Sequence, residues 1–171
     1  SDRGTCIIFG DGAGASIISS TTDKQKSILD VYTSSKGGYN KALSTPMDTG
    51  KMQMQGGEIF KLAVNTLSND AKNILKKNNK TIEDLDLFIP HQANKRIIDK
   101  VGTYINAKPH QVVSTISKYG NTSSASIPMA MNDAYENQRL KKGNLILLNA
   151  FGGGLTWGSA LLYFNADAVS S

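Results

Sequence analysis

The run Leu145-Ile-Leu-Leu-Asn-Ala-Phe151 is followed by Gly152-Gly153-Gly154, and the segment from Thr156 to Phe164 comes directly after Leu155. The first run is short, apolar and continuous, which is typical of a fully buried strand. The second run has the aliphatic and aromatic residues of another strand. The chain therefore ends in two predicted strands joined by a glycine-rich connection, which indicates a β-sheet.

Strands and helices are mixed along the rest of the chain. Apolar residues at spacings of three and four predict a helix over residues 58–77, which should bury Phe60, Ala63, Leu67 and Ile74. The remaining elements are expected as helices at 94–105 and 123–137, strands at 5–9, 15–20, 27–33 and 85–89, a strand or short helix at 112–116, and a functional or mobile loop at 34–57. This order predicts one α/β domain with a mixed five-stranded sheet covered by helices.

Composition narrows the classes of function. The 171 residues carry a net charge of +5, with 16 Lys, 3 Arg and a single Cys. One Cys excludes a disulfide framework and a Cys-rich zinc site, and no apolar run is long enough to span a membrane. The basic residues are scattered and not interleaved with aromatic residues, which favours a solvated surface over a nucleic-acid interface. Because the chain has no initial Met and no leader, we expect that sequence has been lost upstream.

Two motifs near the start of the chain suggest chemistry at first sight. Gly10-x-Gly12-x-Gly14 imitates a dinucleotide-binding fingerprint, but a strand is expected after it where the fingerprint needs a helix. A tight turn between two strands is therefore favoured over nucleotide binding. Cys6 lies within a predicted apolar strand, so we expect an inert core thiol and no nucleophile.

Three features are better placed for function. His91 follows Pro90 at the end of an apolar strand, and loops at the carboxyl ends of strands are where α/β proteins bind ligands. Asn121 lies in Gly-Asn-Thr-Ser, which is also good helix-capping chemistry, so both interpretations stay open. The three glycines after Phe151 exceed the needs of a hairpin and would let the backbone approach a ligand. His110 is expected to be exposed.

Four sequence strings point to one family when they are taken together. They are Phe-Gly-Asp-Gly-Ala-Gly-Ala (9–15), Pro-His-Gln-Ala-Asn-Lys-Arg-Ile (90–97), Tyr-Gly-Asn-Thr-Ser-Ser-Ala-Ser-Ile-Pro (119–128) and Ala-Phe-Gly-Gly-Gly-Leu-Thr-Trp-Gly-Ser-Ala (150–160). In this order they resemble the C-terminal half of the β-ketoacyl-acyl carrier protein synthase III family. The resemblance covers nearly the whole chain.

The resemblance implies a thiolase fold, in which two similar halves form an α-β-α-β-α sandwich with the active site between them. Residues 1–171 would be the C-terminal condensing-enzyme domain, and the N-terminal half with its nucleophilic Cys is absent. The family's reaction starts type II fatty acid synthesis. An acyl group, commonly acetyl, moves from coenzyme A to the Cys. Malonyl-acyl carrier protein then loses carbon dioxide, and the carbanion attacks the acyl thioester.

The resemblance also assigns roles to individual residues. His91 and Asn121 match two neutral donors that stabilise the developing charge on the malonyl thioester oxygen. Gly153 matches a backbone N–H donor to the acyl thioester oxygen. The substrate-binding matches are Gly56, Phe60 and Asn94 along the pantetheine channel and Phe151 beside the nucleophile, and the matches for carrier-protein binding are Lys61 and Arg96.

The resemblance implies no metal and no cofactor, with acyl-CoA and malonyl-acyl carrier protein as substrates. The expected partners are acyl carrier protein, a coenzyme A thioester, the N-terminal half and, in the full-length enzyme, a second copy in a homodimer; neither nucleic acid nor membrane is expected. Location is expected in the cytoplasm or, alternatively, in a plastid-type organelle. The alternative functions are another thiolase-fold condensing enzyme with a Cys-His-Asn set and a non-catalytic assembly domain. We expect the isolated half to be inactive and, with its apolar face exposed, to self-associate.

Overall fold

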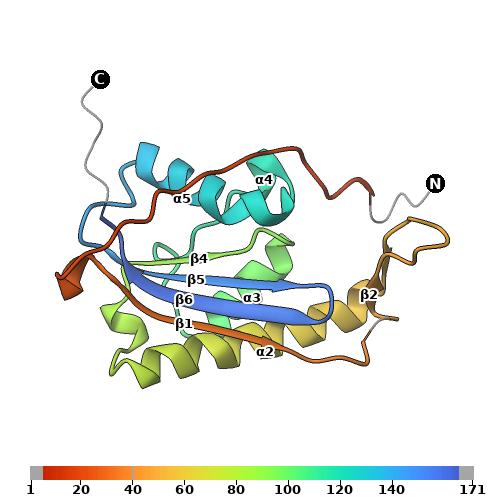
Figure 1. The fold of residues 1–171 in the computed structure, drawn as a ribbon, viewed down its shortest axis with the longest axis horizontal. Helices are drawn as coiled ribbons and strands as arrows, with labels where there is room; N and C mark the ends of the chain where they lie inside the picture. The colour runs from red at the N-terminus through yellow and green to blue at the C-terminus, as the bar shows by residue number, and fades with distance from the viewer. Residues whose placement is uncertain (1–5, 40, 166–171) are drawn as a thin grey trace.

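The computed structural model describes residues 6–39 and 41–165, which form a sheet with helices on both of its faces (Figure 1). The strands lie in the order β1 (Ile28–Ser35), β6 (Thr156–Tyr163), β5 (Leu145–Gly152) and β4 (Leu87–Pro90). β4 and β5 run parallel, whereas β5–β6 and β6–β1 are antiparallel. The predicted α/β class with a mixed sheet is confirmed, but within the described ranges this sheet has four strands, not five.

The hairpin of β5 and β6 forms the centre of the sheet, as its sequence predicts. Leu147 pairs with Leu161 across the two strands, and both side chains are fully buried on one face. Ile146, the residue next to Leu147, belongs to a separate apolar cluster on the other face. Because side chains alternate between the faces of a strand, one hairpin contributes to two separate cores.

Helices α2 (Gly56–Lys77) and α3 (Lys95–Tyr104) cover the face that contains Leu147. Ala63, Leu67 and Ile74 are buried there, as the helical spacing predicts. Phe60 is only partly buried, which corrects that prediction: the Arg96 guanidinium lies 5.3 Å from the centre of its ring, on the outer side of the helix pair. In this first turn of α2, Ile59 is the buried residue.

The opposite face is covered by α4 (Ile116–Tyr119), the 3₁₀ turn η3 (Ser123–Ala125) and α5 (Ser126–Glu136). The segment at 112–116 that could have been a strand or a helix contributes to both, because Val112 forms an isolated parallel bridge with Phe88 and α4 begins at Ile116. Pro128 lies in the first turn of α5, where no intrahelical N–H is needed.

The predicted hairpin of 5–9 and 15–20 is wrong for the residues that the structure describes. Residues 9–20, here called the strap, form no strand apart from a bridge between Phe9 and Asn121. The strap crosses α4 and α5 on the side away from the sheet (Figure 1). A strand needs the edge of another strand for pairing, and the strap lies over helices. Ile17 and Ile18 are therefore exposed at 99% and 78%.

The long segment at 34–57 holds a short hairpin of β2 (Leu43–Ser44) and β3 (Gln53–Met54), which no periodicity had indicated. It packs against the N-terminal end of α2, where Ala42 is buried with Ile59 and Leu155. Two further 3₁₀ turns, η1 (Lys24–Lys26) and η2 (Ile82–Asp84), complete the described elements. None of the described helices is both long and apolar enough to cross a membrane.

Candidate functional site

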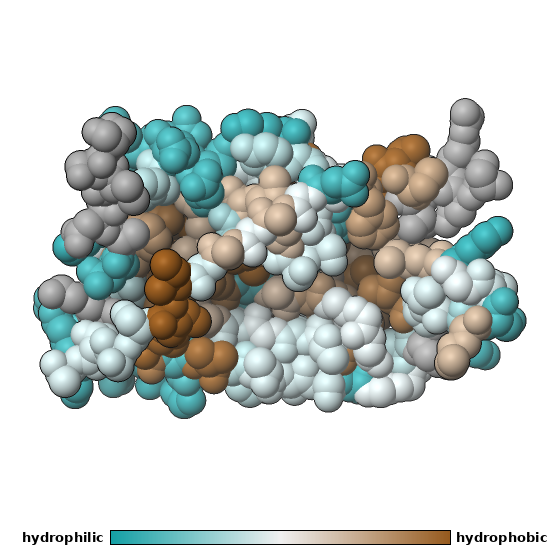
Figure 2. Space-filling view, turned by 45° about the horizontal axis from the view of Figure 1, so that its top comes forward, coloured by the Kyte–Doolittle hydropathy of each residue, from teal (hydrophilic) through white to brown (hydrophobic). Residues whose placement is uncertain are grey.

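A cavity of about 870 Å³ lies between the sheet and the N-terminal end of α5. Strands β1, β5 and β6 form one wall, with small side chains such as Thr33, Ala150 and Ala160, and His91 and Ser126 form part of the other. Figure 2 shows this side of the molecule, where apolar side chains lie in a depression between two rows of paler residues. The helices therefore leave the β6–β1 part of this face uncovered.

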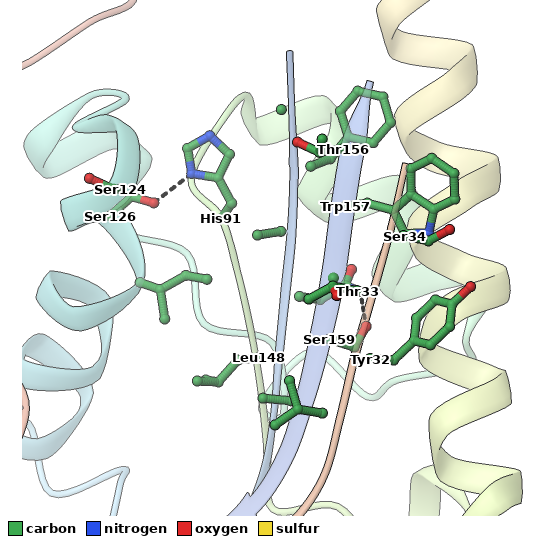
Figure 3. Close-up of a pocket in the computed structure, with 18 of the residues that line it drawn as sticks. Tyr32, Thr33, Ser34, His91, Ser124, Ser126, Leu148, Thr156, Trp157 and Ser159 are labelled. Atoms are coloured by element: carbon green, nitrogen blue, oxygen red, sulfur yellow. Dashed lines mark hydrogen bonds between the residues drawn. The ribbon is translucent and has the colours of Figure 1, made fainter. Parts of the chain in front are cut away.

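His91 lies directly after β4, where its backbone N–H donates to Asn149 of the neighbouring strand at 2.7 Å. Its ring is half-buried, and Nδ1 lies 2.6 Å from the Ser126 hydroxyl oxygen (Figure 3). Burial lowers the pKa of His91 from its ordinary value of 6.5, because desolvation penalises the imidazolium form. Neutral imidazole is therefore the form at neutral pH, as a hydrogen-bond donor to a developing anion requires.

The next residue, Gln92, fixes the loop that carries His91. Its side chain is 1% exposed, and its amide donates to the carbonyls of Pro90 at 2.7 Å and Val113 at 3.3 Å. Its Oε1 accepts the N–H of Thr115 at 2.7 Å. No sequence pattern indicates this role of Gln92, because an amide next to a histidine has no distinctive spacing.

Asn121 is buried at the start of the same helical layer. Its Oδ1 accepts the N–H of Ser123 at 2.9 Å and so stabilises the turn that precedes η3, but the N-cap position of η3 is occupied by Thr122 and not by Asn121. The strap and the residue before it hold its backbone on both sides: Asn121 N–H donates to the carbonyl of Ile8 at 2.8 Å, and Gly10 N–H donates to the carbonyl of Asn121 at 3.0 Å. The amide NH₂ has no hydrogen bond to the described residues and stays available for a ligand, while Ser123 next to it lines the cavity.

The residues of the glycine-rich turn and the strand end before it differ in whether they line the cavity. Phe151 lines the cavity and packs against the sheet core, as expected for a residue that shapes an apolar site. Gly153 is exposed in the turn and its carbonyl accepts the Thr156 hydroxyl at 3.0 Å. A Cβ on Gly153 would meet only Leu43, at 3.8 Å, so close packing does not explain this glycine.

Of the predicted site residues, His91 and Phe151 line the cavity, whereas Asn121 and Gly153 lie next to lining residues and not among them. The others lie at the N-terminal ends of α2 and α3. Gly56 begins α2, and Asn94 caps α3 by accepting the Arg96 N–H at 2.8 Å. Phe60 and Arg96 contact each other, and Arg96 and Lys61 are both exposed. The structure therefore brings Phe60, Asn94 and Arg96 together, and none of the three lines the cavity beside His91.

Two motifs near the start of the chain are corrected by the structure. A Cβ on Gly10 would lie 2.1 Å from the Tyr119 carbonyl oxygen, and one on Gly14 would lie 2.4 Å from Pro128. Alternate glycines therefore let the extended strap pack against the helices, and they form no turn between strands; no helix follows them, which leaves nucleotide binding without support. Cys6 is exposed, not a core thiol, because the strand that should have buried it does not form.

A buried polar chain lies behind the strands that line the cavity. The Ser159 hydroxyl donates to Asp70 of α2 and accepts from Asn149 Nδ2 at 2.7 Å. Burial raises the pKa of Asp70 above its ordinary value of 3.8, partly offset by the hydrogen bond from Ser159. No group of three His, Cys, Asp or Glu side chains suited to a metal ion occurs in the described part of the chain, and His110 is exposed as predicted.

Comparison with solved structures defines the class of protein. The crystal structure of 3-oxoacyl-[acyl-carrier-protein] synthase III from Aquifex aeolicus superimposes with a TM-score of 0.91 at 42% identity, covering 95% of this chain and 52% of that one. The Thermus thermophilus enzyme gives 0.85 at 31% identity, covering 97% of this chain and 55% of that one. A priming β-ketosynthase of the R1128 polyketide pathway gives 0.73 at 29% identity, covering 82% of this chain and 46% of that one. The chain therefore has the thiolase fold.

Sequence comparison identifies the family within that class. The family described as 3-oxoacyl-[acyl-carrier-protein (ACP)] synthase III C terminal matches residues 75–164, and the companion family 3-oxoacyl-[acyl-carrier-protein (ACP)] synthase III matches residues 1–37. The chain belongs to the β-ketoacyl-acyl carrier protein synthase III family. The Campylobacter jejuni subsp. doylei synthase III is 59% identical, covering 98% of this chain and 53% of the relative, and the Helicobacter pylori J99 synthase is 54% identical, covering 95% and 53%. The chain thus spans about half the length of these relatives.

Proposed function

We propose that residues 1–171 are the C-terminal domain of a β-ketoacyl-acyl carrier protein synthase III. The whole enzyme would be an acyltransferase that condenses an acyl-CoA, commonly acetyl-CoA, with malonyl-acyl carrier protein to start type II fatty acid synthesis. The observation that carries the proposal is His91. It lies at the carboxyl end of β4, in the wall of a cavity, with a lowered pKa and with Nε2 free of hydrogen bonds to the described residues.

The most difficult step of the reaction would be decarboxylation of the malonyl thioester. Loss of carbon dioxide leaves an electron pair that is delocalised onto the thioester oxygen, and neutral donors aimed at that oxygen lower the barrier. His91 would donate through Nε2–H and Asn121 through its amide, whose Oδ1 already accepts from Ser123. The carbanion would then attack the acyl group on the Cys of the N-terminal half and displace the thiolate.

Other residues would serve the substrates. Gly153 would offer its N–H to the acyl thioester oxygen, and Phe151 would keep the site apolar. Gly56, Phe60 and Asn94 would line the channel for the pantetheine arm. The exposed cations Lys61 and Arg96 would bind the acidic acyl carrier protein, since rim charges mainly steer association.

The proposal also covers the cofactors, the partners and the cellular compartment of the complete protein. The reaction would need no metal or further cofactor, because the substrates carry the activated acyl groups. The complete protein would contain the N-terminal half, form a homodimer and act in the cytoplasm, with a plastid-type organelle as the alternative. A second candidate function is priming of another thiolase-fold pathway. The likeness to the R1128 priming β-ketosynthase favours it, and it would differ in acyl choice and not in the roles of His91 and Asn121.

The test separates two half-reactions in the full-length protein. Replacing either donor, in His91→Ala or Asn121→Ala, should slow malonyl decarboxylation by about 10²-fold or more. Acyl transfer to the Cys should survive much better. The double variant should lose little beyond the single ones, because both donors serve one charge.

His110→Ala is the matched control, because it removes the other, exposed histidine. It should leave both half-reactions unchanged. Near-normal condensation in Asn121→Ala, or an equal loss of acyl transfer, would overturn the donor role and leave Asn121 with only its role in the turn before η3. Decarboxylation that survives in both single variants would favour a non-catalytic assembly domain.

A further inference from the structure

One ring nitrogen of His91, Nδ1, is hydrogen-bonded to the Ser126 hydroxyl. A neutral imidazole carries one hydrogen, so one nitrogen donates and the other accepts. The hydrogen bond made by one nitrogen decides the role of the other. His91 can donate through Nε2 only if Nδ1 is an acceptor. The partner of Nδ1 is the Ser126 hydroxyl, at 2.6 Å.

The direction of this hydrogen bond follows from a second contact of Ser126. The backbone N–H of Gln92 donates to the same Oγ at 3.2 Å, and a backbone N–H can only donate. Oγ therefore already accepts one hydrogen bond. Among the described residues, the only acceptor that the Ser126 hydroxyl hydrogen can reach is His91 Nδ1. Ser126 is 2% exposed, so solvent offers it no ready alternative.

We propose that Ser126 is a positioning residue, which donates its hydroxyl hydrogen to Nδ1 of His91 and so fixes the tautomer that carries its hydrogen on Nε2. The tautomer itself stands on the contacts of Ser126, and only its catalytic use rests on the proposed function. Figure 3 shows the consequence: the second ring nitrogen of His91 points away from Ser126 and from the helix. The sequence alone does not single out Ser126, because Ser123, Ser124 and Ser126 carry no signal that distinguishes one from another.

The frame around this pair keeps the geometry fixed. Ser126 is the first residue of α5, directly after the η3 turn, whose first residue Ser123 donates its N–H to Asn121 Oδ1. On the other side, Gln92 is tied by its buried amide to two backbone carbonyls, and His91 N–H is bonded to Asn149. Both partners are thus held by backbone hydrogen bonds. The reverse tautomer would leave the Ser126 hydroxyl hydrogen buried without an acceptor, which is unfavourable.

The tautomer can be measured without any activity. In full-length protein with ¹⁵N-labelled histidine, the His91 signals are assigned by their loss in His91→Asn. At a pH where the ring is neutral, we expect Nε2 to carry the hydrogen and Nδ1 to show the shift of an unprotonated nitrogen. Ser126→Ala should produce a mixture of the two tautomers. Ser124→Ala removes an exposed hydroxyl in the same cavity wall and should leave the tautomer unchanged.

Activity gives the second readout. Ser126→Ala should lower kcat for malonyl decarboxylation by about tenfold, the size of one hydrogen bond, and leave KM and acyl transfer little changed. Ser126→Thr keeps the hydroxyl and should restore both the tautomer and the rate.

A wild-type signal with the hydrogen on Nδ1, or an unchanged tautomer in Ser126→Ala, would overturn the proposal. If Ser126→Ala fails to fold, the wild-type signal alone still decides. A correct tautomer combined with full activity of His91→Ala would overturn only the proposed function.

Discussion

The two faces of the sheet are built from the same strands but differ in how they are covered. On the face that α2 and α3 cover, Phe88, Leu147 and Leu161 are completely buried. On the other face, α5 covers β4 and β5, while the part formed by β6 and β1 is open to the cavity. There several of the side chains are small, such as those of Thr33, Ala150 and Ala160, and Val31 of β1 is 58% exposed. We call the face covered by α2 and α3 the closed face, and the face that carries the cavity the open face.

The difference shows which face supplies stability and which supplies function. Large apolar side chains on the closed face have helices to pack against, and their burial favours folding. The open face gives up such burial and instead leaves room beside His91. Substitutions on the closed face should therefore lower stability, and substitutions around the cavity should lower activity.

The largest expected effect is on the closed face. Phe88→Ala should lower the free energy of unfolding by about 3–5 kcal/mol, because a fully buried ring is lost and a cavity remains. The midpoint of urea unfolding, monitored by far-UV circular dichroism, measures this change. A loss below about 1 kcal/mol would mean that the closed face can collapse around the gap.

Val31→Ala on the open face is the matched comparison. In the 171-residue chain, Val31 is exposed, and its truncation should change stability by less than about 0.5 kcal/mol. In the full-length protein, where we propose that the N-terminal half covers this face, the cost should rise to about 1.5 kcal/mol for two buried methyl groups. Equal costs in the two chains would contradict that arrangement of the halves.

The next effect concerns the strap, which lies outside the helices on the open side. Gly10→Ala would place a Cβ against the Tyr119 carbonyl oxygen, which cannot give way as a flexible side chain can. We expect a loss of about 1–3 kcal/mol. Since the N–H of Gly10 donates to the carbonyl of Asn121, hydrogen exchange at the amide of residue 10 should become faster.

Gly57→Ala in the first turn of α2 is the control for this substitution, because nothing lies within 4 Å of its added Cβ. It should be neutral or slightly stabilising, as alanine favours a helix. If Gly10→Ala were as mild as Gly57→Ala, the strap would not be packed against Tyr119.

The closed face was largely predictable from the sequence, and the strap was not. Helical spacing in α2 and the apolar run of β5 each report burial directly, so most of their buried residues followed from local patterns, although Phe60 is only partly buried and α2 begins at Gly56 and not at residue 58. Residues 15–20 have the composition of a strand, but pairing depends on a partner edge that no local pattern describes. For the same reason, Gly10 and Gly14 looked like turn residues although they mediate close packing.

In the candidate site, too, some features could be predicted from the sequence and others could not. The place of His91 after β4 could be predicted, since an apolar run that stops at a proline marks the end of a strand. Its relation to Ser126, 35 residues further along the chain, could not, because it depends on how α5 docks on the sheet. The roles of Asn121 and Gly153 came from the family resemblance and stay predictions.

The smallest expected effect is a pH dependence with opposite sign on the two faces. Burial shifts the pKa of a titratable group on each side of the sheet toward its neutral form: it raises the pKa of Asp70 on the closed face and lowers the pKa of His91 beside the open face. Below pH 6.5 the unfolded state binds the His91 proton more readily than the folded state does. Stability from this group is therefore complete above about pH 6.5 and is lost as the pH falls toward the lowered pKa.

For Asp70 the sign is reversed. Between the ordinary carboxyl pKa of 3.8 and the raised one, the folded state holds a proton that the unfolded state has released, so stability falls as the pH rises through this range. Unfolding free energies measured from pH 4 to 8 should separate the two groups. His91→Gln should remove the loss below about pH 6.5, and Asp70→Asn should remove the decline above about pH 4. If both variants changed the profile in the same direction, at least one of these groups would carry its charge in the folded protein.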